Sequence, residues 1–121
     1  MLTVHDVVKD YAAVLDAVKP DGTPDPPDEP LSLEQNLIDL GWHQKEFQMR
    51  RSFAYTVMSP DESVCLGCVY FYEVDHADAR VHIWVRRSAW EDGLDPVLEH
   101  AVRAWIAEAW PFETLSFPGR E

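Results

Sequence analysis

The chain has 121 residues, 46% of them hydrophobic, which suits one domain with a modest core and is too apolar for disorder. Its formal net charge of −12 argues against partners that are bound through clustered Lys and Arg, so we expect no nucleic-acid partner and no membrane partner. The same charge weakly favours a cationic partner such as a small-molecule amine. No signal peptide or transmembrane run is visible in the sequence, and a cytoplasmic location is therefore expected.

The N-terminal third has structural rather than chemical signals. In residues 1–19, Thr3 and Asp6 form a cap pair ahead of apolar side chains at helical spacing, which predicts a helix. Residues 20–31 are rich in proline and acidic side chains, a composition typical of an extended, mobile linker. The core is expected to occupy residues 32–121, within a single domain overall.

The core is predicted to begin with a second helix, followed by strands. Ser32 and Gln35 fit a capping box, and Gly41 is expected to end or break this helix. Three segments rich in β-branched and aromatic residues predict antiparallel strands at residues 53–58, 64–74 and 80–87. On the middle strand, alternation is expected to place Val64, Leu66, Cys68, Tyr70 and Tyr72 on one face.

A long amphipathic helix is predicted after the third strand. Asp95 fits the N-cap, Pro96 fits the first helical position, and Pro111 stops the helix. Residues 114–117 form a short strand, and a strand–helix–strand unit implies parallel pairing of its two strands. The predicted fold class is therefore α/β, with three antiparallel strands, a helix, a parallel strand, and N-terminal helices packed on the mixed sheet.

The motif Cys65-Leu-Gly-Cys68 is interpreted as two buried free thiols. Residues three apart on a strand point to opposite faces unless a bulge intervenes. A zinc site needs about four ligands, and the sequence has no second cysteine pair to supply them. We therefore expect no metal.

Two side chains are candidate general bases. His82 lies on the third strand, on the same face as Trp84, and its ordinary pKa suits the deprotonation of an amine. The alternative is that His82 is simply a partly exposed strand histidine. Glu73, at the end of the second strand, is the other candidate base.

Several short motifs between residues 31 and 120 carry a resemblance to a known family. They are Leu33–Leu37 with Asp39–Leu40, Phe53–Val57, Leu66–Tyr70, Trp84–Arg86, Gly93–Asp95, Trp110–Phe112 and Pro118–Arg120. With the order of elements, they resemble the GCN5-related N-acetyltransferase (GNAT) superfamily, and more narrowly small bacterial acetyltransferase-like proteins. The resemblance implies a GNAT-like sheet and transfer of an acetyl group from acetyl-CoA to a small amine.

The resemblance also implies where acetyl-CoA would bind. In the superfamily the cofactor lies where the fourth strand separates from the fifth, and a glycine-containing loop holds its diphosphate. The matching positions of this chain are Trp84, Val85, Arg86, Arg87, Trp90, Gly93, Leu94 and Asp95. Of the loop pattern Arg/Gln-x-x-Gly-x-Gly/Ala, only Gly93 is kept, because Trp90 and Asp95 replace its first and last members.

These replacements leave two readings of the loop. The Asp95 carboxylate would repel a diphosphate, although Arg86 and Arg87 could offset part of the repulsion, as could Arg50 and Arg51 if the fold brought them close. Trp90 could stack on the ligand or anchor a subunit contact, but plugging of the site or packing is favoured over a ligand contact.

The resemblance further implies a sheet truncated relative to the full superfamily fold. Open sheet edges are usually paired or covered, so a homodimer is expected. Two functions are weighed: an acetyl-CoA-dependent N-acetyltransferase, or a non-catalytic binding or dimerisation module that has lost acetyl-CoA binding.

Overall fold

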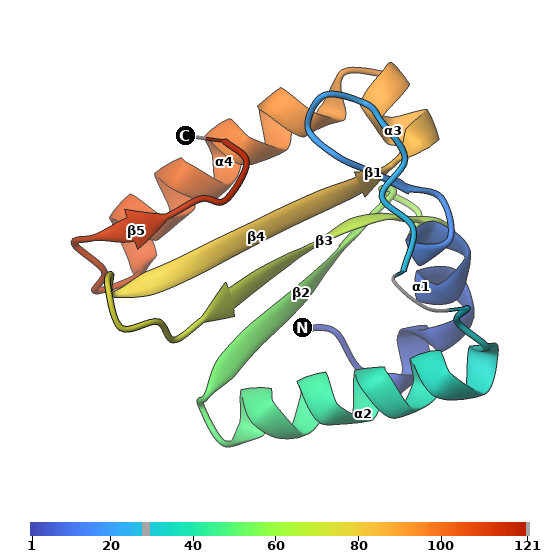
Figure 1. Cartoon of the computed structure of the whole chain (residues 1–121), viewed down its shortest axis with the longest axis horizontal. Helices are drawn as coiled ribbons and strands as arrows, with labels where there is room; N and C mark the ends of the chain where they lie inside the picture. The colour runs from blue at the N-terminus through green and yellow to red at the C-terminus, as the bar shows by residue number, and fades with distance from the viewer. Residues whose placement is uncertain (28–29, 121) are drawn as a thin grey trace.

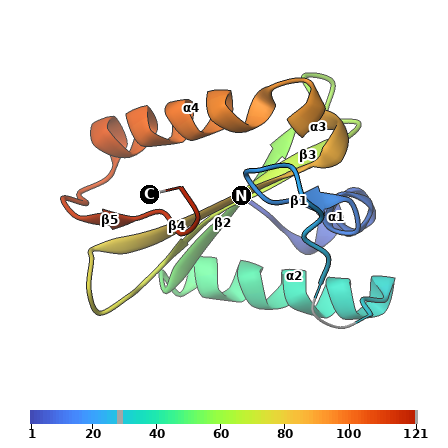
Figure 2. The ribbon, with the colours of Figure 1, turned by 45° about the horizontal axis from the view of Figure 1, so that its top comes forward.

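The computed structural model describes residues 1–27 and 30–120, which form an open sheet with helices on both faces (Figures 1 and 2). The mixed α/β class expected from the sequence is therefore confirmed. In chain order the elements are η1 (Val4–Asp6), α1 (Val7–Val14), β1 (Ala17–Val18), α2 (Leu33–Gln48), β2 (Ser52–Met58), β3 (Cys65–Tyr72), β4 (Ala79–Arg86), α3 (Arg87–Glu91), α4 (Leu94–Ala109) and β5 (Leu115–Ser116).

Strand β4 lies at the centre of the pairing scheme. Strands β2, β3 and β4 pair antiparallel in sequence order, and β5 pairs parallel with the first two residues of β4, as predicted. Strand β1, which the sequence did not predict, pairs antiparallel with Val85 and Arg86. Strand β3 pairs with one edge of β4, and β1 and β5 pair with the two ends of the other edge (Figure 1). The middle of that second edge, between β1 and β5, pairs with neither of them.

The two faces of the sheet carry separate cores. Helix α4 covers one face, and α1 and α2 cover the other (Figure 2). Side chains that alternate along β3 and β4 supply both cores, as expected for a sheet buried on both sides. The α4 side contains Val69, Phe71, Val81, Ile83, Val102, Ile106 and Phe117, and the α1/α2 side contains Leu2, Ala13, Leu40, Ala54, Cys65, Cys68 and Trp84.

The N-terminal caps form largely as predicted. The Thr3 N–H donates to Asp6 Oδ2 at 2.9 Å, and the His5 N–H donates to Thr3 Oγ1 at 3.3 Å. At the start of α2, Ser32 Oγ accepts from the Gln35 N–H at 3.0 Å. The Gln35 side chain does not complete the box, because its Nε2 donates to Asp39 one turn later.

The prediction that Gly41 ends or breaks the second helix is wrong. Helix α2 continues to Gln48, so Gly41 lies in its interior. Glycine costs a helix interior about 1 kcal/mol relative to alanine, which is too little to stop a helix that packs along the sheet. A β-carbon at this position would meet only Val4 Cγ1, at 3.9 Å.

Strand β3 contains a bulge that reverses one predicted orientation. Pairing with β2 shifts from Val57↔Gly67 to Met58↔Cys65, so Leu66 is an extra residue. Leu66 therefore packs against the α4-side cluster around Val85, and the prediction that it shares a face with Cys68 is wrong. The bulge needs glycine at position 67, where a β-carbon would lie 2.1 Å from the carbonyl oxygen of Trp84.

The segment predicted as a mobile linker is partly folded. The Lys19 N–H donates to the Thr23 carbonyl at 2.8 Å, and the Asp25 N–H donates to the Ala17 carbonyl at 2.9 Å. Residues 16–25 therefore form a hairpin on the edge of β4, here named the β1 hairpin. Its partners lie far away in the sequence, which is why local composition did not reveal it. Asp28 and Glu29 of the predicted linker lie outside the described residues.

The predictions that Asp95 is the N-cap of α4 and Pro96 its first helical residue are wrong, because Pro96 is the third residue of the helix. The helix begins at Leu94 with Gly93, at φ +83°, in the N-cap position, and Asp95 is in the first turn. The Asp95 side chain is engaged by Arg120 and makes no cap bond. Part of the predicted loop before it forms α3. Within residues 1–27 and 30–120, no helix has the length and apolar character needed to cross a bilayer.

Candidate functional site

A pocket of about 370 Å³ lies on the α1/α2 side of the sheet. It is here named the acidic pocket. Helices α1 and α2 supply one wall, the end of the β1 hairpin and the segment after it supply a second, and β3 and β4 form the floor. Its lining residues are Asp10, Val14, Ala17, Asp25, Pro26, Pro27, Leu31, Asn36, Asp39, Leu40, His43, Tyr70, Tyr72, His82 and Trp84.

Negative charge dominates this pocket. Asp10, Asp25 and Asp39 contribute carboxyl groups, whereas its described lining contains no lysine or arginine. Asp10 is 1% exposed, and burial, the largest influence, raises its pKa. Asn36 Nδ2 donates to Asp10 Oδ2 at 3.0 Å, which fixes the orientation of the carboxyl group.

Aromatic rings form the floor of the acidic pocket. Tyr70 stacks against His43 with a centroid distance of 5.1 Å and against His82 at 6.0 Å, with both neighbours nearly parallel to it. Trp84 Nε1 donates to the Tyr70 hydroxyl at 3.0 Å. Burial raises the Tyr70 pKa well above its usual value, so the hydroxyl stays protonated. Flat aromatic faces beside carboxyl groups attract organic cations.

The two predicted bases lie in different places. His82 lines the acidic pocket, and burial lowers its pKa, an effect that Asp25 opposes. Its imidazole is therefore neutral near pH 7. Glu73 is exposed and lines a separate hollow of about 170 Å³, which also contains Arg50 and Arg51. Arg50 and Arg51 therefore line the hollow of Glu73 and do not line the hollow beside Gly93, where they could have offset the repulsion of a diphosphate by Asp95.

The β1 hairpin covers the predicted cofactor positions at the end of β4. Val85 and Arg86 pair with β1, and the Arg87 N–H donates to the Asp16 carbonyl at 2.9 Å. Arg86 Nε also lies 3.6 Å from Asp16 Oδ2. The Trp84 side chain lines the acidic pocket.

Trp90 contacts the same hairpin. Its Nε1 donates to the Pro20 carbonyl at 3.1 Å. A β-carbon at Gly22, where φ is +86°, would lie 2.5 Å from the indole ring, so the ring packs directly on the turn. The indole therefore anchors the hairpin to α3.

Arg120 lies between α4 and the uncovered middle of the β4 edge. Its guanidinium forms a bidentate pair with Asp95, at 2.6 and 2.8 Å, and also donates to Glu99 at 3.0 Å. It donates to the Ile83 carbonyl at 3.1 Å. The side chains of Arg120 and Asp95 are only 3% and 7% exposed. We name Arg120, Asp95 and Glu99 the Arg120 cluster.

The remaining predicted loop positions border a different space. Gly93 and Leu94 line a hollow of about 260 Å³ whose other walls include Leu66 and Val97. A β-carbon at Gly93 would meet no atom within 4 Å. The hollow is mainly apolar, and Asp92 is its one charged lining residue among those described.

Sequence reasoning missed Asp10, Asp25, Asp39 and Arg120. Asp10 carried a usable signal, because it interrupts the apolar helical stripe at the i+3 position from Val7. A charged residue on a buried helix face is uncommon without a partner. Asp25, Asp39 and Arg120 gave no such local signal, because contacts between distant segments of the chain determine their surroundings.

Comparison with protein-family models found no match for the chain, and comparison with curated proteins found none either.

Proposed function

We propose that the protein is a non-catalytic binding module of the acetyltransferase-like class that takes a small organic cation in the acidic pocket. The observation that carries the proposal is the combination of carboxyl groups from Asp10, Asp25 and Asp39 with an aromatic floor. A protonated amine would gain charge attraction from the carboxylates and cation–π attraction from the rings.

The GNAT-like assignment is part of this proposal. It is supported by the order of three antiparallel strands, a helix and a parallel strand, and by the way β5 leaves β4 after two paired positions. The matching loop keeps Gly93 with a positive φ at the start of α4.

The loss of acetyl-CoA binding is inferred from the groups at the β4 edge. The backbone of Val85 and Arg86 is paired with β1, and the Arg120 guanidinium bonds the Ile83 carbonyl. The Asp95 carboxylate lies in the first turn of α4, where a diphosphate would need the helix N–H groups and positive charge. These contacts do not fit the cofactor in the position that the resemblance implies.

Acetyl transfer is the second candidate function, favoured by His82. Its side chain lines the acidic pocket, and its lowered pKa makes it available as a neutral base for a bound amine. In that case Arg120 would have to leave the β4 edge before the cofactor could enter.

Thermal melts would test both candidates. The probes are a primary diamine and a quaternary ammonium compound, with a neutral diol of equal length as control, and separately acetyl-CoA, free CoA and ATP. A ligand at about 100 times its dissociation constant adds about 2.7 kcal/mol of stability. We expect stabilisation by the cations only.

Two variants locate the binding. Asp39→Asn should weaken the cation response, because it removes a pocket charge while keeping side-chain size. Asp61→Asn should leave it unchanged, because Asp61 lies in the turn between β2 and β3. Equal responses to cations and the diol would refute the amine pocket. A response specific to the CoA compounds would favour acetyl transfer.

The homodimer also remains a proposal. In the described part of the chain no strand pairs with the outer edge of β2. The outer surface of α2 exposes Leu37, Ile38, Trp42 and Met49. Light scattering at several protein concentrations would measure the mass, and a monomer at high micromolar concentration would argue against the dimer.

A further inference from the structure

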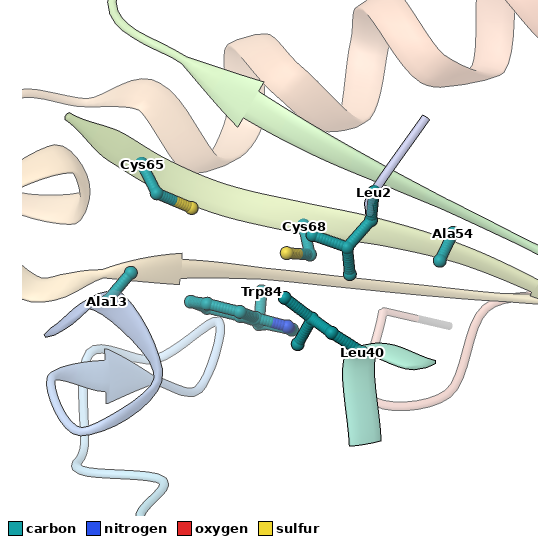
Figure 3. Packing of buried hydrophobic residues seen from close by; sticks show 7 residues of the cluster. All are labelled: Leu2, Ala13, Leu40, Ala54, Cys65, Cys68 and Trp84. Carbon is teal, nitrogen blue, oxygen red and sulfur yellow. The ribbon is translucent and has the colours of Figure 1, made fainter. Parts of the chain in front are cut away.

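Three potential metal ligands meet beneath the acidic pocket. One carboxyl oxygen of Asp10 and the sulfurs of Cys65 and Cys68 all lie within 4.8 Å of one another. Asp10 comes from α1, whereas the cysteines flank the bulge in β3. Figure 3 shows the two sulfurs directed toward each other on the same face of the sheet. The prediction of two buried free thiols is confirmed. The two sulfurs lie on one face because β3 contains a bulge, with Leu66 as its extra residue, and the bulge reverses the alternation.

Burying the Asp10 carboxyl group beside the two thiols costs folding free energy unless a bound group compensates for it. Asp10 is 1% exposed and both cysteines are 0% exposed. Apart from the Asn36 bond to Asp10, the contacts of the cluster involve sulfur, such as Cys68 Sγ to Asp10 Oδ1 at 3.4 Å and Cys65 Sγ to Thr56 Oγ1 at 3.4 Å. Sulfur hydrogen bonds are weak, so they offset little of the cost of burying polar groups.

We propose that Asp10, Cys65 and Cys68 form a binding site for one zinc-class divalent cation. Sulfur and carboxylate ligands together suit Zn²⁺, whereas Mg²⁺ and Ca²⁺ prefer oxygen alone. This inference does not rest on the proposed amine function, but the two sites share Asp10, so a bound metal ion would occupy a carboxyl group of the acidic pocket.

The spacing of the ligand atoms fits a tetrahedral site. With Zn–S near 2.3 Å and Zn–O near 2.0–2.2 Å, a sulfur and an oxygen ligand in a tetrahedron lie about 3.5–3.7 Å apart, and two sulfurs about 3.8 Å apart. The Cys68 Sγ–Asp10 Oδ1 separation of 3.4 Å is close to this distance. The remaining separations are at most 4.8 Å, so each needs to close by about 1 Å.

The surroundings of Asp10 favour this role. Asn36 holds Oδ2, which leaves Oδ1 directed toward Cys68. Such outer hydrogen bonds orient the ligands of metal sites. Asp10 also lines the acidic pocket, whereas the two cysteines do not, so a fourth ligand has to approach from the Asp10 side. Three protein ligands leave the fourth tetrahedral position to water or another ligand.

The test uses the full chain, metal-stripped and kept reduced. Co²⁺ serves as the spectroscopic probe, and Zn²⁺ is then added as competitor. We expect one Co²⁺ per chain, with thiolate-to-cobalt charge-transfer absorption and tetrahedral visible bands that Zn²⁺ removes and Mg²⁺ does not. Absence of charge-transfer absorption in the wild-type protein would overturn the proposal, and this result needs no variant to fold.

Variants then assign the ligands. Cys68→Ser should remove most of the charge-transfer band and weaken Zn²⁺ binding by more than roughly 100-fold, because even outer partners cost 10- to 100-fold. Asp10→Asn should keep the sulfur band and weaken binding. Asp61→Asn is the matched control, since it changes an exposed carboxylate in the turn between β2 and β3, outside both the cluster and the acidic pocket. Equal affinity in wild type and Cys68→Ser would overturn the proposal.

Discussion

Replacing Arg120 with methionine should destabilise the protein strongly. The substitution keeps a long unbranched side chain but leaves Asp95, 7% exposed at its side chain, without its bidentate partner. Removing one member of a buried ion pair typically costs about 3–5 kcal/mol, because the remaining charge is buried and uncompensated. Glu99 contributes little to this loss, since its side chain is 27% exposed and retains Arg103.

The magnitude can be measured by urea unfolding followed by tryptophan fluorescence. For a small domain the free energy of unfolding falls by about 1–3 kcal/mol per molar urea, so a loss of about 3 kcal/mol lowers the midpoint by at least about 1 M. The control is the double variant Arg120→Met with Asp95→Leu. Replacing both partners by apolar groups is often nearly neutral, so the double variant should recover much of the lost stability.

Either of two results would refute this reasoning. A loss below about 1 kcal/mol for Arg120→Met would place the pair in the range of solvent-exposed salt bridges. A double variant that is less stable than Arg120→Met would mean that the Asp95 carboxylate stabilises the helix without its arginine.

Gly67→Ala should destabilise by about 2 kcal/mol or more in the same urea assay, because the new β-carbon would lie 2.1 Å from a backbone oxygen. The matched variant Gly41→Ala should stabilise by about 0.5–1 kcal/mol, and a loss instead would mean that the interior of α2 needs glycine. Hydrogen bonds from Ser63 and Ser59 lower the pKa of Asp61 to about 2, below the unfolded value of about 3.9. Its contribution to stability is therefore complete above about pH 4 and lost as the pH falls toward 2, and a carboxyl NMR titration with a midpoint near 4 would contradict this. Burial lowers the folded-state pKa of His82 below its unfolded value of about 6.5, so protonation favours unfolding and stability falls as the pH drops through that value. His82→Gln should reduce this slope, and an unchanged slope would exclude His82 as its source.

Local patterns were sufficient for most helices and strands. Helix capping by Thr3 and Ser32 depends only on residues within a few positions, and so does the alternation along β4. These features can therefore be predicted from the sequence alone. The bulge at Leu66 was not predictable in this way, because register depends on the pairing of β3 with two other strands and on the close approach of Trp84 to Gly67.

The candidate site was predictable only in part. His82 was identified because it lies on a clearly alternating strand, whereas Trp84 was named only as a cofactor position that the resemblance implied. The carboxyl groups of the acidic pocket come from α1, α2 and the β1 hairpin, and these meet only when the helices pack on the sheet. Arg120 reaches Asp95 across 25 positions, a contact that no local pattern encodes.

The β1 hairpin also determines how the sheet can come apart. Its bond from Trp90 to Pro20 joins residues 70 positions apart, so docking must follow closure of a long loop. The hairpin attaches through short β1, the contacts of Asp16 with Arg86 and Arg87, and one indole, and its opening would cost less than unfolding of β3 and β4. An opened hairpin would leave the end of β4 with unsatisfied backbone groups, which the same hairpin of another copy could satisfy. Exchange of this segment between two chains would then produce a domain-swapped dimer without any new interface chemistry.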